Sequence, residues 1–369
     1  MTPGRGENAG ILGPMLPSRP HASTRLLIVT QVLDTEHPVL GFFHQWVAAL
    51  AVRYESIEII CLTLGRFDLP KNVRVHSLGK PRFAQATRGT GARFVSRITY
   101  ALRFLALAWR LRHSYDAVFV HMNQEYVLIT GWLWKLLGKR VYLWRNHYAG
   151  SFATDVAAMF STNVFCTSTH SYTAKYRKTR IMPVGIDTDR FRPDPSTTRT
   201  PRSILFFSRI ARSKRPELLI DALALLGRRG VAYTADIVGS PGAEDRAYHE
   251  ALMENVRTRG LAGQISFLPG VANAKAPALY RAHEIFVNAS PSGMLDKTLF
   301  EAAACGATVL AGSEDFAALA GQEWSFSSAE ELAGRLAERL GQPPPSTLVE
   351  LASRESLPAL IDRLVETLY

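Results

Sequence analysis

The residues best suited to chemistry lie in two loops of the C-terminal half, and each loop combines a cation with the start of a helix. In the first loop, Arg209 and Lys214 stand five residues apart between an apolar run and an expected helix. An arginine fork and a lysine point charge at the end of a strand suit a diphosphate, although a basic surface loop has the same pattern. We predict an anion site here.

The second loop leads from Ser290 into a short helix that we expect to begin near residues 296–298. The free N–H groups and the dipole of a helix start favour a phosphate, and Lys297 adds a positive charge. Glu301 lies about one turn inside the helix, where its carboxylate can accept hydrogen bonds from two ribose hydroxyls. The alternative is a capped helix with a solvated glutamate.

Short apolar runs alternate with helix-length segments and must position these loops. Such runs are typical of strands buried in a parallel sheet, so the pattern predicts an α/β fold. Expected strands cover residues 26–30, 57–62, 117–121, 141–144, 164–166, 203–207, 235–238, 265–268, 285–288 and 308–311. Expected helices include residues 43–53, 94–112, 216–226, 248–259 and 298–304.

A proline-rich break at residues 183–201 separates two doubly wound, Rossmann-like domains, which we expect to face each other across a cleft. The N-terminal domain covers residues 25–182, and the C-terminal domain covers residues 202–355. Residues 1–24 are predicted to be a disordered leader. Residues 356–369 are predicted to form a helix that packs back on the N-terminal domain.

The net charge of +11 is concentrated in the N-terminal half. Residues 1–200 hold 26 Lys/Arg and 12 Asp/Glu, whereas residues 201–369 hold 17 and 20. An excess of this size indicates an anionic partner: nucleic acid, a phospholipid surface or a phosphorylated substrate. The sequence has no motif that is known to recognise nucleic acid, so we expect no nucleic-acid partner.

Residues 92–112 predict a basic amphipathic helix. Val95, Ile98, Leu102, Leu105 and Trp109 fall on one side, and Arg93, Arg97, Arg103 and Arg110 on the other, with Phe104, Leu107 and Leu111 among the arginines. Such a helix suits the surface of an anionic bilayer, and the alternative is a domain helix with its apolar side in the core and its arginines in solvent. Both hold if the first side faces the core while the arginines contact lipid head groups or an anionic acceptor. No apolar window is long enough to span a bilayer.

Taken with residues 182–193 (MPVGIDTDRFRP), the two loops resemble the family-4 retaining glycosyltransferases, which have the GT-B fold. The resemblance runs from about Arg25 to the C-terminus. It implies that Arg209 and Lys214 grip the donor diphosphate and that Glu301 holds the ribose. Gly239 resembles a glycine lining the donor cleft, and Leu268 resembles the strand end that contacts the base.

The sequence departs from the family at Gly293, where the usual motif has the first of two glutamates. Donor binding in this loop is therefore assigned to Gly293, Met294, Leu295, Asp296 and Lys297 together, with Asp296 or the backbone amides of Met294 and Leu295 replacing the missing carboxylate.

The N-terminal half is predicted to supply the acceptor side. Gly41 resembles the flexible glycine loop that approaches the donor phosphate, and His147 resembles a histidine that contacts the donor sugar or the reacting centre. Further acceptor-side candidates follow other strands or begin a helix: His44, His121, Asn123 and Glu125. No histidine spacing here is typical of a metal site.

The expected function is transfer of a sugar from a nucleotide-diphospho-sugar to a lipid-linked glycan or cell-envelope precursor, with retention of configuration. His147, Arg209 and Lys214 are the expected catalytic residues, and no cofactor or metal is expected. We expect a bacterial protein in the cytoplasm, peripheral on the inner face of the membrane. Three alternatives remain: a nucleotide-sugar epimerase or hydrolase, a non-catalytic sugar-nucleotide-binding protein and, from charge alone, a nucleic-acid binder.

Overall fold

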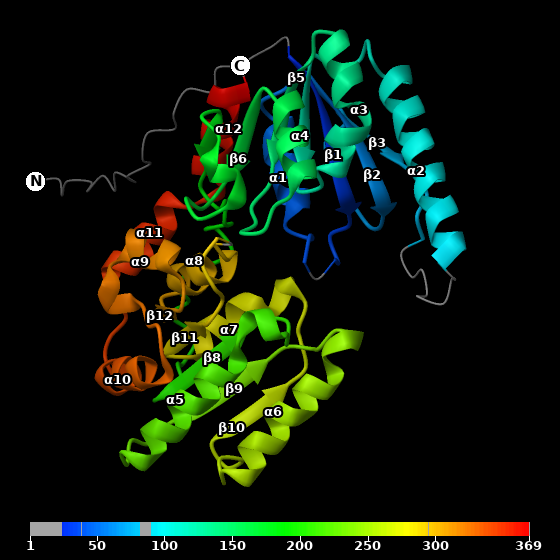
Figure 1. Ribbon diagram of the computed structural model, residues 1–369. Coiled ribbons are helices and arrows are strands. Elements are labelled where there is room, and N and C mark those ends of the chain that lie inside the picture. Colours follow the sequence, from blue (N-terminus) through cyan, green and yellow to red (C-terminus); the bar gives the residue numbers. More distant parts are fainter. Residues whose placement is uncertain (1–23, 38, 82–89, 294, 369) are drawn as a thin grey trace, which may run out of the picture.

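Two parallel β-sheets, each covered by helices, form the frame of the protein (Figure 1). The computed structural model describes residues 24–37, 39–81, 90–293 and 295–368. The predicted leader therefore lies outside the described residues except for Thr24. The α/β fold with two doubly wound domains is confirmed.

The N-terminal sheet has the strand order β3-β2-β1-β4-β5-β6-β7, and every pairing is parallel. Its strands are β1 (Arg25–Leu33), β2 (Ser56–Leu64), β3 (Val73–Ser77), β4 (Ala117–His121), β5 (Arg140–Trp144), β6 (Asn163–Cys166) and β7 (Thr179–Ile181). Its helices are α1 (Phe43–Ala51), α2 (Thr90–Arg110), α3 (Glu125–Leu136) and α4 (Phe152–Phe160).

The C-terminal sheet has the order β10-β9-β8-β11-β12 and is also parallel. Its strands are β8 (Ser203–Phe207), β9 (Thr234–Val238), β10 (Ile265–Leu268), β11 (Ile285–Asn288) and β12 (Thr308–Ala311). The helices that follow are α5 (Pro216–Arg228), α6 (Arg246–Thr258), α7 (Ala276–Ala282), α8 (Lys297–Ala304), α9 (Glu314–Ala320), α10 (Ala329–Arg339), α11 (Ser346–Arg354) and α12 (Leu357–Leu368).

Continuous apolar runs suit these strands because helices cover both faces of the sheet. In β1, Leu26 and Ile28 pack into a core with α1 and α12, whereas Leu27 and Val29 pack into a second core with α2 and α3. All ten apolar runs predicted as strands are strands. The sequence analysis missed β3 and β7, which are edge strands that are not fully buried and therefore lack a continuous apolar run.

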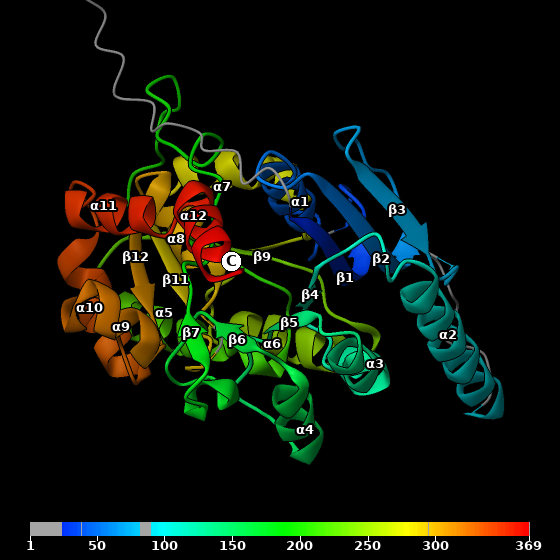
Figure 2. The ribbon, with the colours of Figure 1, turned by 90° about the horizontal axis from the view of Figure 1, so that it is seen from above.

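The chain passes between the domains twice, and the two crossings lie side by side. The backbone N–H groups of Gly185 and Ile186 both donate to the carbonyl of Glu355, at 3.0 Å each. Gly185 has a φ of +68°, and an added Cβ would lie 2.3 Å from a methyl carbon of Leu360. After this crossing, α12 packs against α1 and the N-terminal sheet (Figure 2).

The helix predicted over residues 92–112 is α2, and the interpretation that places its first side in the core is wrong. Val95, Ile98, Leu102 and Trp109 are exposed, whereas Phe104 and Ala108 are fully buried. Phe104 packs against Tyr126 and Trp134 of α3. Both sides of α2 carry apolar residues, so periodicity did not decide which side meets the domain. The side chain of Arg93 lies outside the described residues.

Candidate donor and acceptor site

The loop between β8 and α5 places two predicted cations at the carboxyl end of a central strand. Arg209 is exposed directly after β8, while Lys214 ends a short 3₁₀ turn (Arg212–Lys214) and is mostly buried. The Lys214 ammonium lies 2.7 Å from Oδ2 of Asp296 and donates to Oγ of Ser290 at 3.1 Å. This contact joins the two loops that the sequence analysis identified.

Asp296 is the residue that holds this junction together. It precedes the first residue of α8, and its Oδ2 also accepts hydrogen bonds from Ser290 at 2.7 Å and from Asn288 at 3.0 Å. Burial alone would raise the pKa of Asp296, but the charge and hydrogen bond of Lys214 outweigh it and hold that pKa below its usual value. Asp296 therefore stays ionised and fixes the position of the lysine.

Glu301 and Lys297 lie one turn apart on α8, where Glu301 is buried and Lys297 is half-buried. Oε2 of Glu301 accepts a hydrogen bond from the Tyr280 hydroxyl at 3.3 Å. The Lys297 ammonium instead donates to the carbonyl of Gly185 at 2.6 Å and lies over the rings of Phe42 and Trp46. Desolvation raises the pKa of Glu301 and lowers that of Lys297. Lys297 thus points toward the N-terminal domain, away from the Lys214 junction.

Gly239 and Leu268 end neighbouring strands on the other side of β8. The N–H of Gly239 donates to the carbonyl of Leu268 at 3.0 Å, and Leu268 is exposed. A Cβ at Gly239 would lie only 1.9 Å from the carbonyl oxygen of Ser208. Only glycine fits at position 239, because the chain after β9 approaches the chain after β8 so closely. The C-terminal candidates therefore share one edge of the sheet.

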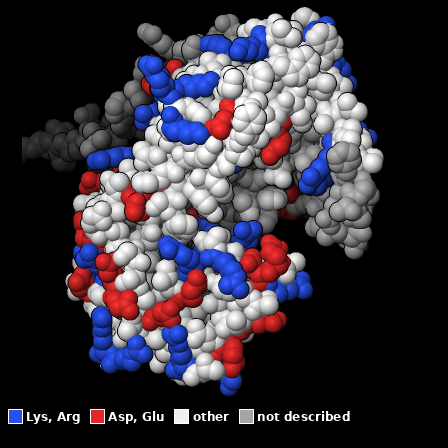
Figure 3. Space-filling view, in the orientation of Figure 1, with Lys and Arg blue, Asp and Glu red and all other residues white. Residues whose placement is uncertain are grey.

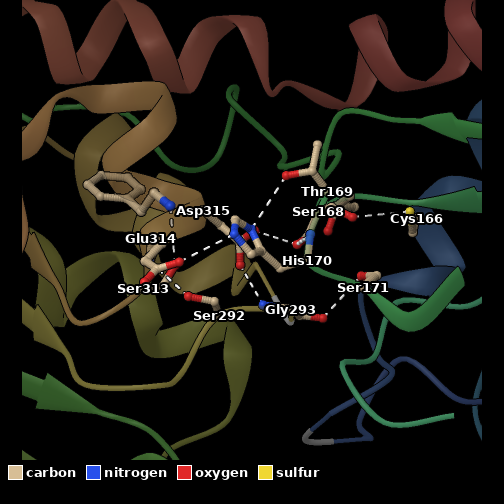
Figure 4. Close-up of polar contacts among 12 residues, drawn as sticks. Cys166, Ser168, Thr169, His170, Ser171, Ser292, Gly293, Ser313, Glu314 and Asp315 are labelled. Carbon is tan, nitrogen blue, oxygen red and sulfur yellow. Dashed lines mark hydrogen bonds and ion pairs between the residues drawn. The ribbon is translucent and has the colours of Figure 1, made fainter. Parts of the chain in front are cut away.

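A polar network around the buried carboxylate of Asp315 joins this edge to the N-terminal domain (Figure 4). Asp315, at the start of α9, accepts the Gly293 N–H at 2.5 Å and a hydrogen bond from the Ser168 hydroxyl, and its Oδ1 lies 2.8 Å from Nδ1 of His170. The Ser171 hydroxyl donates to the Gly293 carbonyl at 3.1 Å. Loops at the carboxyl ends of β6, β11 and β12 therefore meet here.

The network leaves no room for a side chain at position 293. Gly293 has a φ of +91°, and a Cβ at this position would lie 2.5 Å from Cβ of Tyr148 and 2.9 Å from the His170 carbonyl oxygen. With the domains arranged in this way, a side chain at position 293 would collide with the N-terminal domain. In the same loop Leu295 is buried, and Met294 lies outside the described residues.

His147 lies on the loop that approaches Gly293. Its ring stacks on Tyr148, and its Nδ1 accepts the Ala149 N–H at 2.9 Å. The side chain is partly exposed, so it remains accessible to a ligand. The structure thus brings His147 to the same domain boundary as Gly293.

Gly41 and His44 surround the start of α1. Gly41 closes a tight turn, because its N–H donates to the His37 carbonyl and an added Cβ would lie 2.7 Å from that oxygen. Nε2 of His44 accepts the backbone N–H of Asp68 at 3.1 Å, which ties α1 to the loop after β2. In this arrangement His44 has a structural contact as well as partial exposure.

His121 is a correction to the predicted acceptor side. Its ring is fully buried and stacks on Phe43 with a centroid distance of 3.9 Å. Burial lowers the pKa of His121 to about 3, with a smaller effect from the charge of Lys297. His121 is a neutral core residue because α1 covers the end of β4. Asn123 is partly exposed and Glu125 is exposed at the start of α3.

The sequence analysis missed Ser168, His170, Tyr148 and Asp315. Ser168 and His170 directly follow the short strand β6, and Asp315 follows the serine N-cap of α9 after β12. Polar residues at the carboxyl ends of parallel strands are the usual ligand contacts of such sheets. That rule could have pointed to all three loops, but not to the contact between them.

The described residues contain neither a metal-binding cluster nor a membrane-spanning helix. No group of three or more His, Cys, Asp or Glu in this part of the chain is arranged to hold a metal ion. None of its helices is both long and apolar enough to cross a membrane.

Comparison with known proteins identifies the domain that carries Arg209, Lys214 and Glu301. Residues 201–341 match the family model described as Glycosyl transferases group 1. The match covers most of the C-terminal domain and less than half of the chain. In this domain, the loops after β8 and β11 form the junction of Lys214 with Asp296 described above.

Curated relatives match over part of the chain. D-inositol 3-phosphate glycosyltransferase of Rhodococcus opacus is 31% identical over 152 residues, which are 38% of this chain and 34% of that protein. The GDP-mannose-dependent alpha-(1-6)-phosphatidylinositol monomannoside mannosyltransferase of Mycobacterium tuberculosis is 30% identical over 148 residues, 36% of this chain and 37% of that protein. The chain thus spans about a third of the length of these relatives.

Solved structures match over nearly the whole chain. HepE of Anabaena, solved in complex with UDP, superposes with a TM-score of 0.71 at 18% identity and covers 93% of this chain and 99% of HepE. Sucrose-phosphate synthase of Thermosynechococcus elongatus gives a TM-score of 0.69 at 15% identity, covering 93% and 98%. These likenesses show that the two domains together have the GT-B fold.

Proposed function

We propose that this protein transfers a sugar from a nucleotide-diphospho-sugar to an acceptor hydroxyl, with retention of anomeric configuration and without a metal. The acceptor class is a lipid-linked glycan or cell-envelope polysaccharide precursor, and the site of action is the cytoplasmic face of the membrane. The family of the C-terminal domain supports the reaction class, and HepE, which was solved with UDP, supports the donor class.

One observation carries the donor assignment: Lys214 is held by Asp296 and Ser290 at the carboxyl ends of β8 and β11, with Arg209 exposed on the same loop. Fixed cations at this edge of a doubly wound sheet favour a diphosphate. We assign diphosphate neutralisation to Arg209 and Lys214. The Glu301 carboxylate oxygen that does not contact Tyr280 is assigned to the ribose.

The proposed reaction is a front-face displacement. The bond between the anomeric carbon and the diphosphate oxygen breaks, the acceptor oxygen bonds to the same face, and the acceptor proton passes to the leaving diphosphate. Arg209 and Lys214 stabilise the charge that develops on the leaving group, a role that a metal ion fills in other enzymes. His147 orients the sugar or the acceptor at the domain boundary.

The first experiment is a thermal-shift panel of nucleotides, nucleotide sugars and free sugars. A ligand that binds the folded state raises the unfolding temperature, so the matching nucleotide sugar should give the largest shift. Product analysis with the matching donor then separates the alternatives: transfer requires an added acceptor, whereas an epimerase or hydrolase forms product without one. No shift with any nucleotide would overturn the donor assignment.

A second function has one observation in its favour. Both polar backbone groups of Gly293 are hydrogen-bonded: its N–H donates to Asp315 of its own domain, and its carbonyl accepts from Ser171 of the N-terminal domain. A loop engaged in this way suits a protein that binds a sugar nucleotide without turnover. Tight nucleotide-sugar binding without product after prolonged incubation with acceptor extracts would favour this function over transfer.

A further inference from the structure

The exposed side of α2 forms an apolar stripe at the outer edge of the N-terminal domain. Val95, Ile98, Leu102 and Trp109 recur at helical spacing, and Leu102 and Trp109 remain 62% and 49% exposed. The opposite side of α2 is already used, because Phe104 and Ala108 are buried against the domain. The stripe therefore does not contribute to the core of the domain and stays exposed.

Positive charge borders this stripe, and the segment of the sequence that contains it has no acidic residue. Arg97, Arg103 and Arg110 of α2 are exposed, and the Arg112 guanidinium lies 4.2 Å above the Trp109 ring. Between residues 69 and 115 the sequence has ten Lys/Arg and no Asp/Glu. A tryptophan beside arginines, with apolar side chains along one helix face, suits the boundary between lipid head groups and acyl chains.

A shallow groove continues this surface toward the edge of the sheet. It has a volume of about 380 Å³ and runs between α2 and the end of β3, where Leu78 and Leu107 provide apolar lining. Arg103 and Arg110 also line it, and Arg103 donates to the Leu78 carbonyl at 3.1 Å. The groove suits a phosphate-bearing head group with the start of its acyl chain.

The position of α2 connects this surface with the site. The helix follows β3 and precedes β4, so it begins at the carboxyl edge of the sheet and runs back along it. Figures 1 and 2 both place α2 at the outer edge of the molecule, on the side of its own domain away from the C-terminal sheet. Val95 and Ile98 lie nearest the edge that carries His147.

We infer that α2 docks this protein onto an anionic phospholipid bilayer through its exposed apolar stripe, with the flanking arginines on the lipid phosphates. Charge complementarity selects this occupant over a second copy of the chain, because two like-charged stripes would repel each other. The inference rests on the proposed function in one respect: a bilayer at this edge presents a lipid-linked acceptor to the domain boundary.

The test is co-sedimentation of the full chain with vesicles, in the absence of donor. Wild type should bind phosphatidylcholine vesicles that contain phosphatidylglycerol, bind pure phosphatidylcholine far more weakly, and lose most binding between about 0.1 M and about 1 M salt. The double variant Leu102→Gln and Trp109→Gln should lose binding to both. Arg97→Gln with Arg110→Gln should weaken binding to the anionic vesicles about tenfold or more.

The matched control is Met253→Gln with Leu319→Gln, which changes two C-terminal residues that are 46% and 47% exposed and should leave vesicle binding unchanged. Equal binding of the α2 variant and wild type would overturn the inference. So would a concentration-dependent dimer that the α2 variant disrupts without any vesicle binding, which would assign the stripe to a second copy. Nucleotide binding, measured separately, reports whether the proposed function itself fails.

Discussion

The two domains share one architecture but hold their charge in opposite ways. In the C-terminal domain, which is slightly acidic overall, a few cations are fixed at one edge of the sheet, and Lys214 is held by Asp296. In the N-terminal domain the excess of positive charge is spread over exposed surface, including α2 (Figure 3). Fixed charge suits a small phosphorylated ligand, and spread charge suits an extended anionic surface.

The largest effect should come from the fixed charges. Replacing Arg209 and Lys214 together by alanine should reduce transfer at least about 10⁴-fold, because each contact to a developing charge contributes about 10²–10³ in rate. Initial rates with a saturating donor measure this loss. Arg212→Ala, on the same loop but packed on Tyr248, is the matched control and should stay near wild-type rates.

Lys214 also neutralises Asp296, so unfolding must be followed in the same variants. Lys214→Arg keeps the charge and should keep most of the stability while losing rate. Full activity in the double alanine variant would show that the fixed cations of the C-terminal domain take no part in transfer.

The next effect concerns the contact between the domains at Gly293. Replacing Gly293 by glutamate should lower the free energy of unfolding by about 3 kcal/mol or more, because φ is positive and the added side chain meets Tyr148. Urea unfolding measures it. Gly263→Ala is the control, since a Cβ there meets nothing within 4 Å. Unchanged stability with higher activity in Gly293→Glu would mean that the domains separate in the working enzyme.

Asp315 should give a somewhat smaller loss. Asp315→Ala leaves the Gly293 N–H and the Ser168 hydroxyl without their buried acceptor, which should cost about 2 kcal/mol in unfolding free energy. Glu314→Ala changes the exposed neighbouring carboxylate and should stay within about 0.5 kcal/mol of wild type. If the two variants lost equal stability, the network would contribute nothing beyond its surface charge.

The last prediction concerns how the free energy of unfolding depends on pH, which should differ between a buried and an exposed histidine of the N-terminal domain. The pKa of His121 is about 3 in the folded chain against an ordinary 6.5, so between these values only the unfolded chain binds the proton. This contribution to stability is complete above pH 6.5 and is lost as the pH falls toward 3, by about 1.4 kcal/mol per unit.

In His121→Phe this part of the pH dependence should disappear. Urea unfolding at about pH 7 and about pH 5 should therefore differ by about 2 kcal/mol less in the variant than in wild type. His113→Gln, an exposed histidine, is the control and should keep the wild-type difference. Identical slopes in all three proteins would show that His121 is hydrated.

Much of the C-terminal site was predictable because its chemistry is local in sequence. Arg209 and Lys214 share one loop, and Asp296, Lys297 and Glu301 share one helix start, so strand ends alone bring them to one edge. The direction of each side chain was not predictable. Lys297 turns toward Phe42 and Trp46 because the other domain offers it aromatic faces and a carbonyl.

The N-terminal predictions depended more on packing, and they changed more. His121 follows a strand as predicted, but α1 covers it and makes it a core residue. Helix α2 has two apolar sides, and the side that carries Phe104 is the one that packs against α3. Neither outcome is encoded in the spacing of one segment, because each depends on which neighbour packs against it.

From its residues alone, the chain specifies two parallel-sheet domains, because continuous apolar runs require two covered faces. The residues also predict an anion site at one strand end, because a loop before a helix offers free N–H groups. The approach of segments far apart in sequence is set by the folded arrangement of the domains. His170 and Asp315 are 145 residues apart, yet they share a hydrogen bond across the boundary. Their contact, the glycine at position 293 and the exposed stripe of α2 follow from how the layers and domains pack, since burial is a property of the assembled fold.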